Sequence, residues 1–214
     1  MKPILCYVTD GKAPGAADPT ANVLAQIRAA AAAGVDWVQI RERHAPAREL
    51  LALAKAATDA CDGRARVIIN DRLDVALAAG AAGVHLRGTS VPAREVVRWC
   101  RAGNAPAGFL IGVSCHSVAE AREAESAGAS YLFFGPVFET PSKKSFGAPQ
   151  GIARLAEVCR SVRIPAIAIG GVNEENAAEC LRAGAEGIAA IRMFQESREP
   201  EEFRKTVARL HSAG

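Results

Sequence analysis

One histidine of the sequence stands where acid/base chemistry is expected. His116 follows an apolar segment, in a Ser-Cys-His run that begins at Ser114. An imidazole has an unperturbed pKa of about 6.5, so it accepts and donates protons near neutral pH. His44 and His211 are expected to be exposed, and His85 lies inside an apolar run. We therefore predict His116 as the catalytic residue; the alternative is that it only caps the next helix.

A pair of glycines indicates a phosphate site. Gly170 and Gly171 directly follow an apolar segment, and glycine allows backbone N–H groups to approach an anion closely. The residues after the last apolar segment, Arg192 and Met193, are predicted to complete this phosphate site with their own N–H groups. The alternative is that the glycine pair forms a plain turn.

Polar side chains with directed donors follow two further apolar segments. Gln39, Arg41 and Arg43 alternate along the chain, so their side chains share one side and predict binding of a polar ring or a phosphate. Asn70 and Asp71 follow the next apolar segment. Two alternatives stay open: Arg41 pairs with a structural carboxylate, near Glu42 or at Asp71, or the Asn-Asp pair only caps the following helix.

A basic segment is predicted to form a loop over the site. Residues 141–149 have no hydrophobic periodicity, and they include Ser142, Lys143 and Lys144 directly after Thr140. A basic loop that closes over an acidic small molecule is the functional interpretation. The alternative is a solvated surface loop.

A repeated pattern positions these residues. Four times, an Ala-rich helix end is followed by a glycine and then by a short apolar run, at Gly34, Gly80, Gly128 and Gly184. The intervals of 46, 48 and 56 residues are about twice the length that one strand plus one helix needs, so each must contain a second strand. The candidates for the remaining strands are Arg66–Asn70, Leu110–Ser114, Ala166–Gly170 and the opening segment Ile4–Thr9.

Eight such strands, each followed by a helical stretch, predict a (β/α)8 TIM barrel, an α/β fold in which residues 1–214 form a single domain. An open doubly wound sheet fits the same alternation but leaves two strand edges unpaired. In a closed barrel the chemistry lies at the carboxyl ends of the strands. The polar residues described above follow the strands at that end.

Composition narrows the functional classes. Half of the 214 residues are hydrophobic, and 26 Lys plus Arg against 23 Asp plus Glu give a net charge of +3. With no basic run and no apolar stretch of about 20 residues, neither nucleic acid nor a membrane is the expected partner, and we expect a cytoplasmic protein. Six cysteines without a C-x-x-C pair favour free thiols over a zinc site. The expected partner is a small phosphorylated substrate, and a homo-oligomer is possible.

Longer motifs connect the chain to a known superfamily. They are VQIRER at Val38–Arg43, the stretch Ile69–Leu86, IGVSCHS at Ile111–Ser117, FGPVFETPSKK at Phe134–Lys144 and IPAIAIGGV at Ile164–Val172. With these motifs, the chain resembles the thiamine phosphate synthase and thiazole tautomerase superfamily over nearly its whole length.

The resemblance to the synthase implies that a pyrimidine diphosphate loses diphosphate to Mg²⁺ and basic groups, after which the nitrogen of a thiazole phosphate attacks. The resemblance implies that Asp71 is one of two metal ligands. The residues that match the substrate-binding pattern of the synthase are Gln39, Arg41, Asn70, Ser114, Thr140 and Lys143. Three positions depart from the synthase pattern: Ser90 replaces the second metal-binding aspartate, Arg43 a lysine and Arg192 a serine. Loss of one carboxylate weakens a Mg²⁺ site.

The resemblance to the tautomerase implies a proton shift on a carboxylated thiazole phosphate, with a histidine as acid/base and without metal. The runs I-R-E-R, S-x-H-S and F-E-T-x-x-K-K favour this branch, whereas Asn70-Asp71-Arg72 keeps the synthase form. We predict a thiazole tautomerase that uses His116 and no cofactor. The first alternative is a thiamine phosphate synthase with Mg²⁺ at Asp71; the second is a non-catalytic binder of thiazole or thiamine phosphate.

Overall fold

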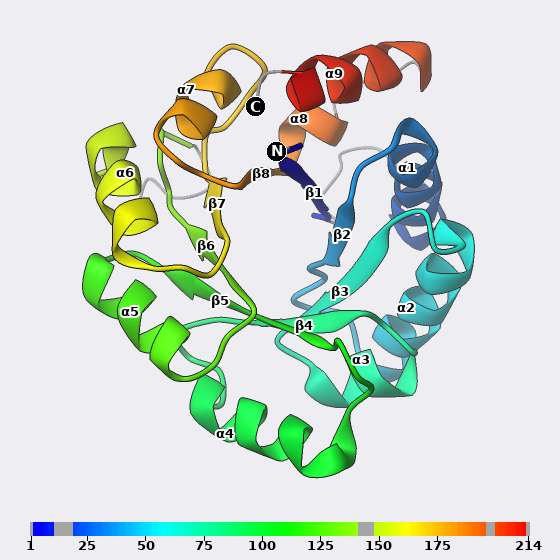
Figure 1. Cartoon of the computed structure of the whole chain (residues 1–214). Coiled ribbons are helices and arrows are strands. Elements are labelled where there is room, and N and C mark those ends of the chain that lie inside the picture. Colours follow the sequence, from blue (N-terminus) through cyan, green and yellow to red (C-terminus); the bar gives the residue numbers. More distant parts are fainter. Residues whose placement is uncertain (1, 11–18, 141–147, 196–199, 213–214) are drawn as a thin grey trace.

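The computed structural model describes residues 2–10, 19–140, 148–195 and 200–212. In these ranges, strands and helices alternate along the chain (Figure 1). The strands are β1 (Ile4–Val8), β2 (Trp37–Ile40), β3 (Arg66–Asn70), β4 (Gly83–Leu86), β5 (Leu110–Cys115), β6 (Tyr131–Phe134), β7 (Ala166–Ile169) and β8 (Gly187–Ala190). The helices are α1 (Pro19–Ala33), α2 (Ala47–Cys61), α3 (Leu73–Ala78), α4 (Ala93–Trp99) with the turn η1 (Cys100–Asn104), α5 (Val118–Ser126), α6 (Gly151–Ser161), α7 (Ala177–Arg182), α8 (Arg192–Gln195) and α9 (Pro200–Ser212).

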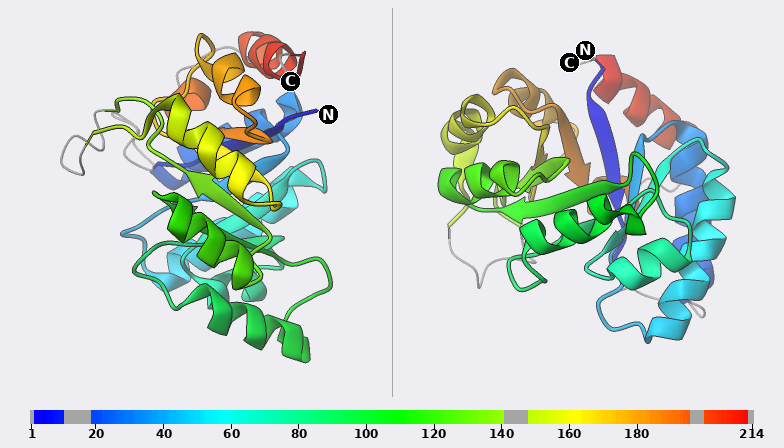
Figure 2. Two further views of the ribbon diagram at one scale, coloured as in Figure 1. Left: turned by 60° about the vertical axis from the view of Figure 1, so that its left-hand side comes forward. Right: turned by 60° about the horizontal axis from the view of Figure 1, so that its bottom comes forward.

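The strands form a closed parallel barrel in the order β1 to β8. Closure is made by β1, in which Tyr7 stands in register with Val38 of β2 on one side and with Ala190 of β8 on the other. The helices surround this barrel in every view (Figures 1 and 2). The predicted (β/α)8 fold is therefore confirmed, and the open doubly wound sheet is excluded because neither β1 nor β8 is left as an edge.

The four repeated glycines end helices, as their spacing predicts. Gly34, Gly80, Gly128 and Gly184 have φ of 95°, 64°, 88° and 101°. This left-handed backbone conformation strains any residue with a Cβ, so glycine terminates the helix and directs the chain into the next strand. The recurring Ala-Gly pattern is thus the local cause of the alternating fold.

Two separate cores hold the barrel together. The inner core fills the barrel with side chains that include Trp37, Tyr131, Phe133 and Ile167. Gly112 makes room for the Tyr131 ring, because a Cβ at this position would stand 2.1 Å from Tyr131 Cζ. The outer core lies between the barrel and the helices, and it includes the fully buried side chains of Leu155 and Ile188. The strands are covered on both faces, which explains their continuous apolar sequences.

No helix in the described part of the chain is both long enough and apolar enough to cross a membrane.

Candidate active site at the carboxyl ends of the strands

Gln39 and Asn70 form a polar pair at the top of β2 and β3. Gln39 is 2% exposed, and its Nε2 donates a hydrogen bond to Asn70 Oδ1 at 3.1 Å. The Oε1 of Gln39 is also buried, and no donor in the described residues reaches it. A buried amide oxygen without a partner is costly, so this atom marks a place where a ligand N–H group would be stabilised.

Thr9 positions Arg41 from the neighbouring strand end. The Thr9 hydroxyl is fully buried, donates to Glu42 Oε1 at 2.6 Å and accepts from the backbone N–H of Arg41 at 3.0 Å. Our sequence analysis missed Thr9. It directly follows β1, so the rule that strand ends carry the chemistry would have found it.

Arg41 lies in a group of charged side chains. Burial lowers the pKa of Arg41 most, and the nearby charges of Arg43 and Arg87 lower it further, against the opposing effects of Asp10 and Glu42. Arg43 itself is exposed. The alternative that Arg41 pairs with Asp71 is wrong, because Asp71 binds another arginine.

Asp71 is held by two residues that follow β4. Arg87 Nη2 donates to Asp71 Oδ2, and the Ser90 hydroxyl donates to Asp71 Oδ1. Burial opposes ionisation of Asp71, but the hydrogen bonds from Ser90 and Arg87 outweigh it, so the pKa of Asp71 is lowered. Helix α3 begins with Arg72 at its N-cap and without a side-chain cap. The Asn-Asp pair therefore does not cap that helix.

A buried histidine supports Ser114 from inside the barrel. His85 is 1% exposed, and its Nε2 lies 2.9 Å from Ser114 Oγ while its Nδ1 lies 3.1 Å from the Tyr131 hydroxyl. Burial lowers the pKa of His85 to about 3, so the ring is neutral at physiological pH. Sequence reasoning placed His85 only within a strand; a polar side chain inside an apolar run is the signal that would have singled it out.

His116 is exposed at the mouth of the barrel. Its ring Nδ1 is hydrogen-bonded to the carbonyl oxygen of Gly135, at the end of β6. The alternative that His116 caps α5 is wrong: the N-cap is Ser117, whose hydroxyl accepts from the N–H of Glu120 at 3.2 Å. Because Nδ1 faces a carbonyl oxygen, it carries the proton in the neutral ring, and Nε2 has the lone pair.

The glycine pair after β7 is packed under the loop that follows β6. Gly170 and Gly171 have φ of 92° and 70°. The carbonyl oxygen of Gly170 accepts from the N–H of Phe138 at 2.9 Å, and that of Gly171 accepts from Asn176 Nδ2 at 3.0 Å. An anion binds N–H donors and not carbonyl oxygens, so only the N–H groups of this pair are candidates for an anion site. A phosphate here stays a prediction.

Two more predicted residues come together across the mouth. Arg192 Nη2 donates to Thr140 Oγ1 at 3.3 Å, which joins the start of α8 to the loop after β6. The side chain of Met193 packs on the outer core, so only its backbone is a candidate for phosphate binding. Ser142, Lys143 and Lys144 lie outside the described residues.

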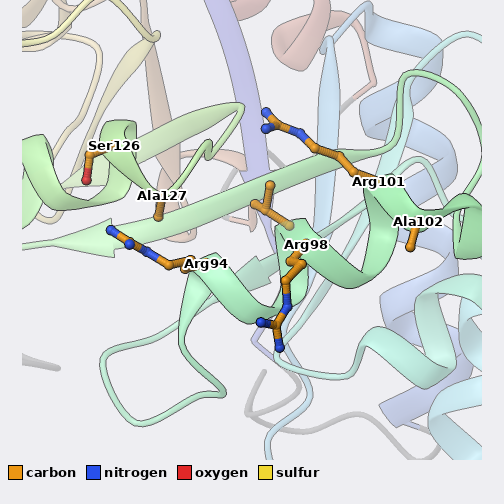
Figure 3. Close-up of a pocket in the computed structure, with 7 residues that line it drawn as sticks. Arg94, Arg98, Arg101, Ala102, Ser126 and Ala127 are labelled. Atoms are coloured by element: carbon orange, nitrogen blue, oxygen red, sulfur yellow. The ribbon is translucent and has the colours of Figure 1, made fainter.

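A basic hollow of about 510 Å³ lies elsewhere, between the outer helices α4 and α5. Arg94, Arg98 and Arg101 line one side of this hollow, opposite Ser126 and Ala127 (Figure 3). Arg98 is already paired with Glu95. The hollow shares no residue with the predicted site.

The closed parallel barrel, with polar residues gathered at the carboxyl ends of its strands, defines a (β/α)8-barrel protein with a candidate site at that end. Residues 5–194 match the protein family described as thiamine monophosphate synthase, and the chain belongs to this family.

Two relatives and one solved structure show how far the similarity extends. A thiamine-phosphate synthase of Methanoculleus marisnigri is 45% identical over 77% of this chain and 76% of its own length. A thiamine-phosphate synthase from a Roseiflexus species is 39% identical over 92% of this chain and 80% of its own length. The structure of a thiamine phosphate pyrophosphorylase from Pyrococcus furiosus is 33% identical, with a TM-score of 0.78 over 98% of this chain and 97% of that one.

These relatives correct one prediction. The preference for the tautomerase branch is not supported, because the relatives carry the name of the synthase. That preference depended on short motifs at strand ends. By the family resemblance both reactions handle a thiazole phosphate, so such motifs discriminate less between them than similarity along the whole chain.

Proposed function

We propose that this chain is a thiamine-phosphate synthase, which joins hydroxymethylpyrimidine diphosphate to a thiazole phosphate and releases diphosphate. Membership of the family supports the proposal, together with the names of relatives that align over most of the chain. The substrates on this proposal are two small phosphorylated molecules.

The observation that carries the proposal is the unsatisfied oxygen of Gln39. Its Oε1 is buried beside Asn70 with no donor among the described residues. An aminopyrimidine offers an exocyclic N–H donor next to ring nitrogens that accept hydrogen bonds. Gln39 Oε1 would accept from the amino group, which satisfies the buried oxygen only when the ring is bound.

Positive charge at the mouth suits the leaving group. In the proposed reaction the bond between the pyrimidine methylene and the diphosphate oxygen breaks, and its electron pair leaves with the oxygen. Arg43 and Arg87 both lie within electrostatic reach of Arg41, and the charge of this group would stabilise the developing negative charge of the diphosphate. The lone pair of the thiazole nitrogen then forms the new C–N bond to the methylene cation.

Other strand ends would orient the second substrate. The thiazole phosphate group is assigned to the N–H groups of Gly170 and Gly171, with Arg192 and Thr140 nearby. Ser114 is held in place by His85, and we assign it to substrate binding.

His116 needs a separate role on this proposal. Its acid/base assignment belongs to the tautomerase reaction, in which a proton leaves one ring atom and returns at another. Formation of the C–N bond requires no such transfer between ring atoms. The Nδ1 contact to Gly135 supports a positioning role for His116 at the end of β6.

The residues at Asp71 do not fit a Mg²⁺ site of the kind that the family resemblance implies. One carboxylate is present, and its two oxygens are engaged by Arg87 and Ser90. Among the residues with described positions, no group of three or more His, Cys, Asp or Glu side chains is arranged to hold a metal ion. A cation would have to displace a guanidinium that already neutralises Asp71.

The direct test is to incubate the purified protein with both substrates and to quantify thiamine phosphate by chromatography. An Arg41→Met variant serves as a matched control, because methionine keeps much of the side-chain bulk but removes the charge. We expect product with the wild type and a strong loss with the variant. Turnover of a carboxylated thiazole phosphate alone, with no coupling, would instead identify a tautomerase. Binding without turnover of either substrate set would identify a non-catalytic binder.

A further inference from the structure

Arg87 occupies an unusual place in the site. It directly follows β4 and reaches back to Asp71, while its own backbone N–H donates to the Ser90 hydroxyl at 2.7 Å. The N–H of Ser90 in turn donates to the carbonyl oxygen of Arg87 at 3.0 Å. These contacts close a small ring of Asp71, Arg87 and Ser90 that fixes the guanidinium at the mouth.

The guanidinium has donors to spare. Nη2 is bound to Asp71, but Nε is buried and has no acceptor among the residues that the structure describes. The side chain is still 39% exposed, so a ligand in the mouth can reach it. A guanidinium presents five N–H donors in a planar fork that matches the oxygens of a phosphate group.

The same ring of contacts opposes binding of a divalent cation at Asp71. A metal ion at Asp71 would stand next to the charge of Arg87, and the repulsion between the two opposes its binding. A positive charge already stands beside Asp71, in the side chain of Arg87.

We propose that the guanidinium of Arg87, anchored on Asp71, takes the place of a divalent cation and binds the diphosphate group of the substrate. The inference rests on the proposed synthase function, because that function supplies the diphosphate. In this role Asp71 is a positioning residue for Arg87, and Ser90 holds Asp71 in turn. The diphosphate oxygens would engage the exposed N–H groups of the guanidinium.

The test measures binding of inorganic diphosphate by titration calorimetry in the presence of EDTA. We expect the wild type to bind without metal, and Arg87→Gln to weaken binding about 10- to 100-fold, the effect of losing a hydrogen bond to a charged group. Arg87→Lys, which keeps the charge but loses the fork, should fall in between. Arg94→Gln, on the outer face of α4, is the matched control and should bind like the wild type.

A second arm measures the metal directly, with Mn²⁺ followed by electron paramagnetic resonance. The wild type should bind Mn²⁺ weakly, and the double variant Arg87→Gly, Ser90→Asp should bind it more tightly because it offers two carboxylates and no guanidinium. Far-ultraviolet circular dichroism verifies that each variant is folded. If Arg87→Lys also fails to fold, the wild-type titrations decide the question alone.

The inference is overturned if diphosphate binds the wild type only when metal is added, or if folded Arg87→Gln binds it as tightly as the wild type in EDTA. Thiamine phosphate formation is assayed separately. A protein that binds diphosphate through Arg87 but forms no product would contradict the proposed function while leaving the diphosphate site intact.

Discussion

Replacement of Thr9 by valine tests whether the end of β1 positions Arg41. Valine keeps the shape of threonine but lacks the hydroxyl that donates to Glu42 and accepts from the N–H of Arg41. A buried N–H left without its acceptor costs about 1–3 kcal/mol, and a lost hydrogen bond to a charged group costs about 1.5–3 kcal/mol. Since the two effects share one hydroxyl, we expect a net loss of about 3 kcal/mol in the free energy of unfolding.

Two assays follow this substitution. In a chain of this size a loss of about 3 kcal/mol lowers Tm by about 6–12 °C, which scanning calorimetry resolves. Because the backbone of Arg41 loses its anchor, KM for the pyrimidine diphosphate should also rise, while KM for the thiazole phosphate changes little.

Thr9→Ser is the control, since serine retains the hydroxyl and loses one buried methyl group, at a cost of about 1 kcal/mol. Equal stabilities of the Ser and Val variants would refute the reasoning about the hydroxyl. A fall in Tm without any change in KM would show that Thr9 supports the fold but does not position Arg41.

Three further predictions concern the two histidines and the glycine pair. The pKa of His85 is about 3 in the folded chain and about 6.5 in the unfolded chain. Between these pH values only the unfolded chain takes up a proton at His85. The contribution of His85 to the free energy of unfolding is therefore fully present above pH 6.5, and it falls by about 1.4 kcal/mol for each pH unit below that. Denaturant titrations at pH 5 and 7 should show this loss of about 2 kcal/mol in the wild type, and a folded His85→Asn variant with the same difference would contradict it. His116→Asn should lower the rate of thiamine phosphate formation by less than about tenfold, whereas a fall of about 10²–10⁴ with a changed pH profile would establish acid/base catalysis. Gly171→Val should weaken thiazole phosphate binding by about 1–3 kcal/mol, because a Cβ at this position would lie 2.5 Å from the carbonyl oxygen of Glu139. Gly108 also has a positive φ, of +78°, but has open space around it, so Gly108→Val is the control for backbone strain. Equal affinities of the two variants would argue against a phosphate site at Gly171.

The sequence by itself determined the order and type of most elements. Positive φ at each helix end is a local requirement that glycine alone meets without strain, so the four Ala-Gly repeats located the joins. The predicted strand Arg66–Asn70 agrees with β3, and the predicted strand Leu110–Ser114 is one residue shorter than β5. Closure followed from the number of strands, because it removes the unpaired edges.

The strand-end rule also located most of the candidate site, since a parallel barrel brings all carboxyl ends of its strands to one face. Gln39 and Asn70 were selected by this rule and do form a pair. What the rule does not specify is the partner of each side chain. The backbone direction at a strand end is set locally. The partner of a side chain depends on which donor or acceptor atom from a neighbouring strand end lies within about 3 Å of it.

Tertiary structure alone decided which residues contact Asp71. From the sequence it was a helix cap, a partner of Arg41 or a metal ligand; in the barrel it binds Arg87 and Ser90, because β3 and β4 are adjacent and in parallel register. The same holds for His85, which looks like a strand residue in the sequence but contacts Ser114 and Tyr131 across the barrel interior. Hydrogen bonds and ion pairs between residues far apart in sequence act over a few ångströms, so only the closed barrel, which sets those distances, determines them.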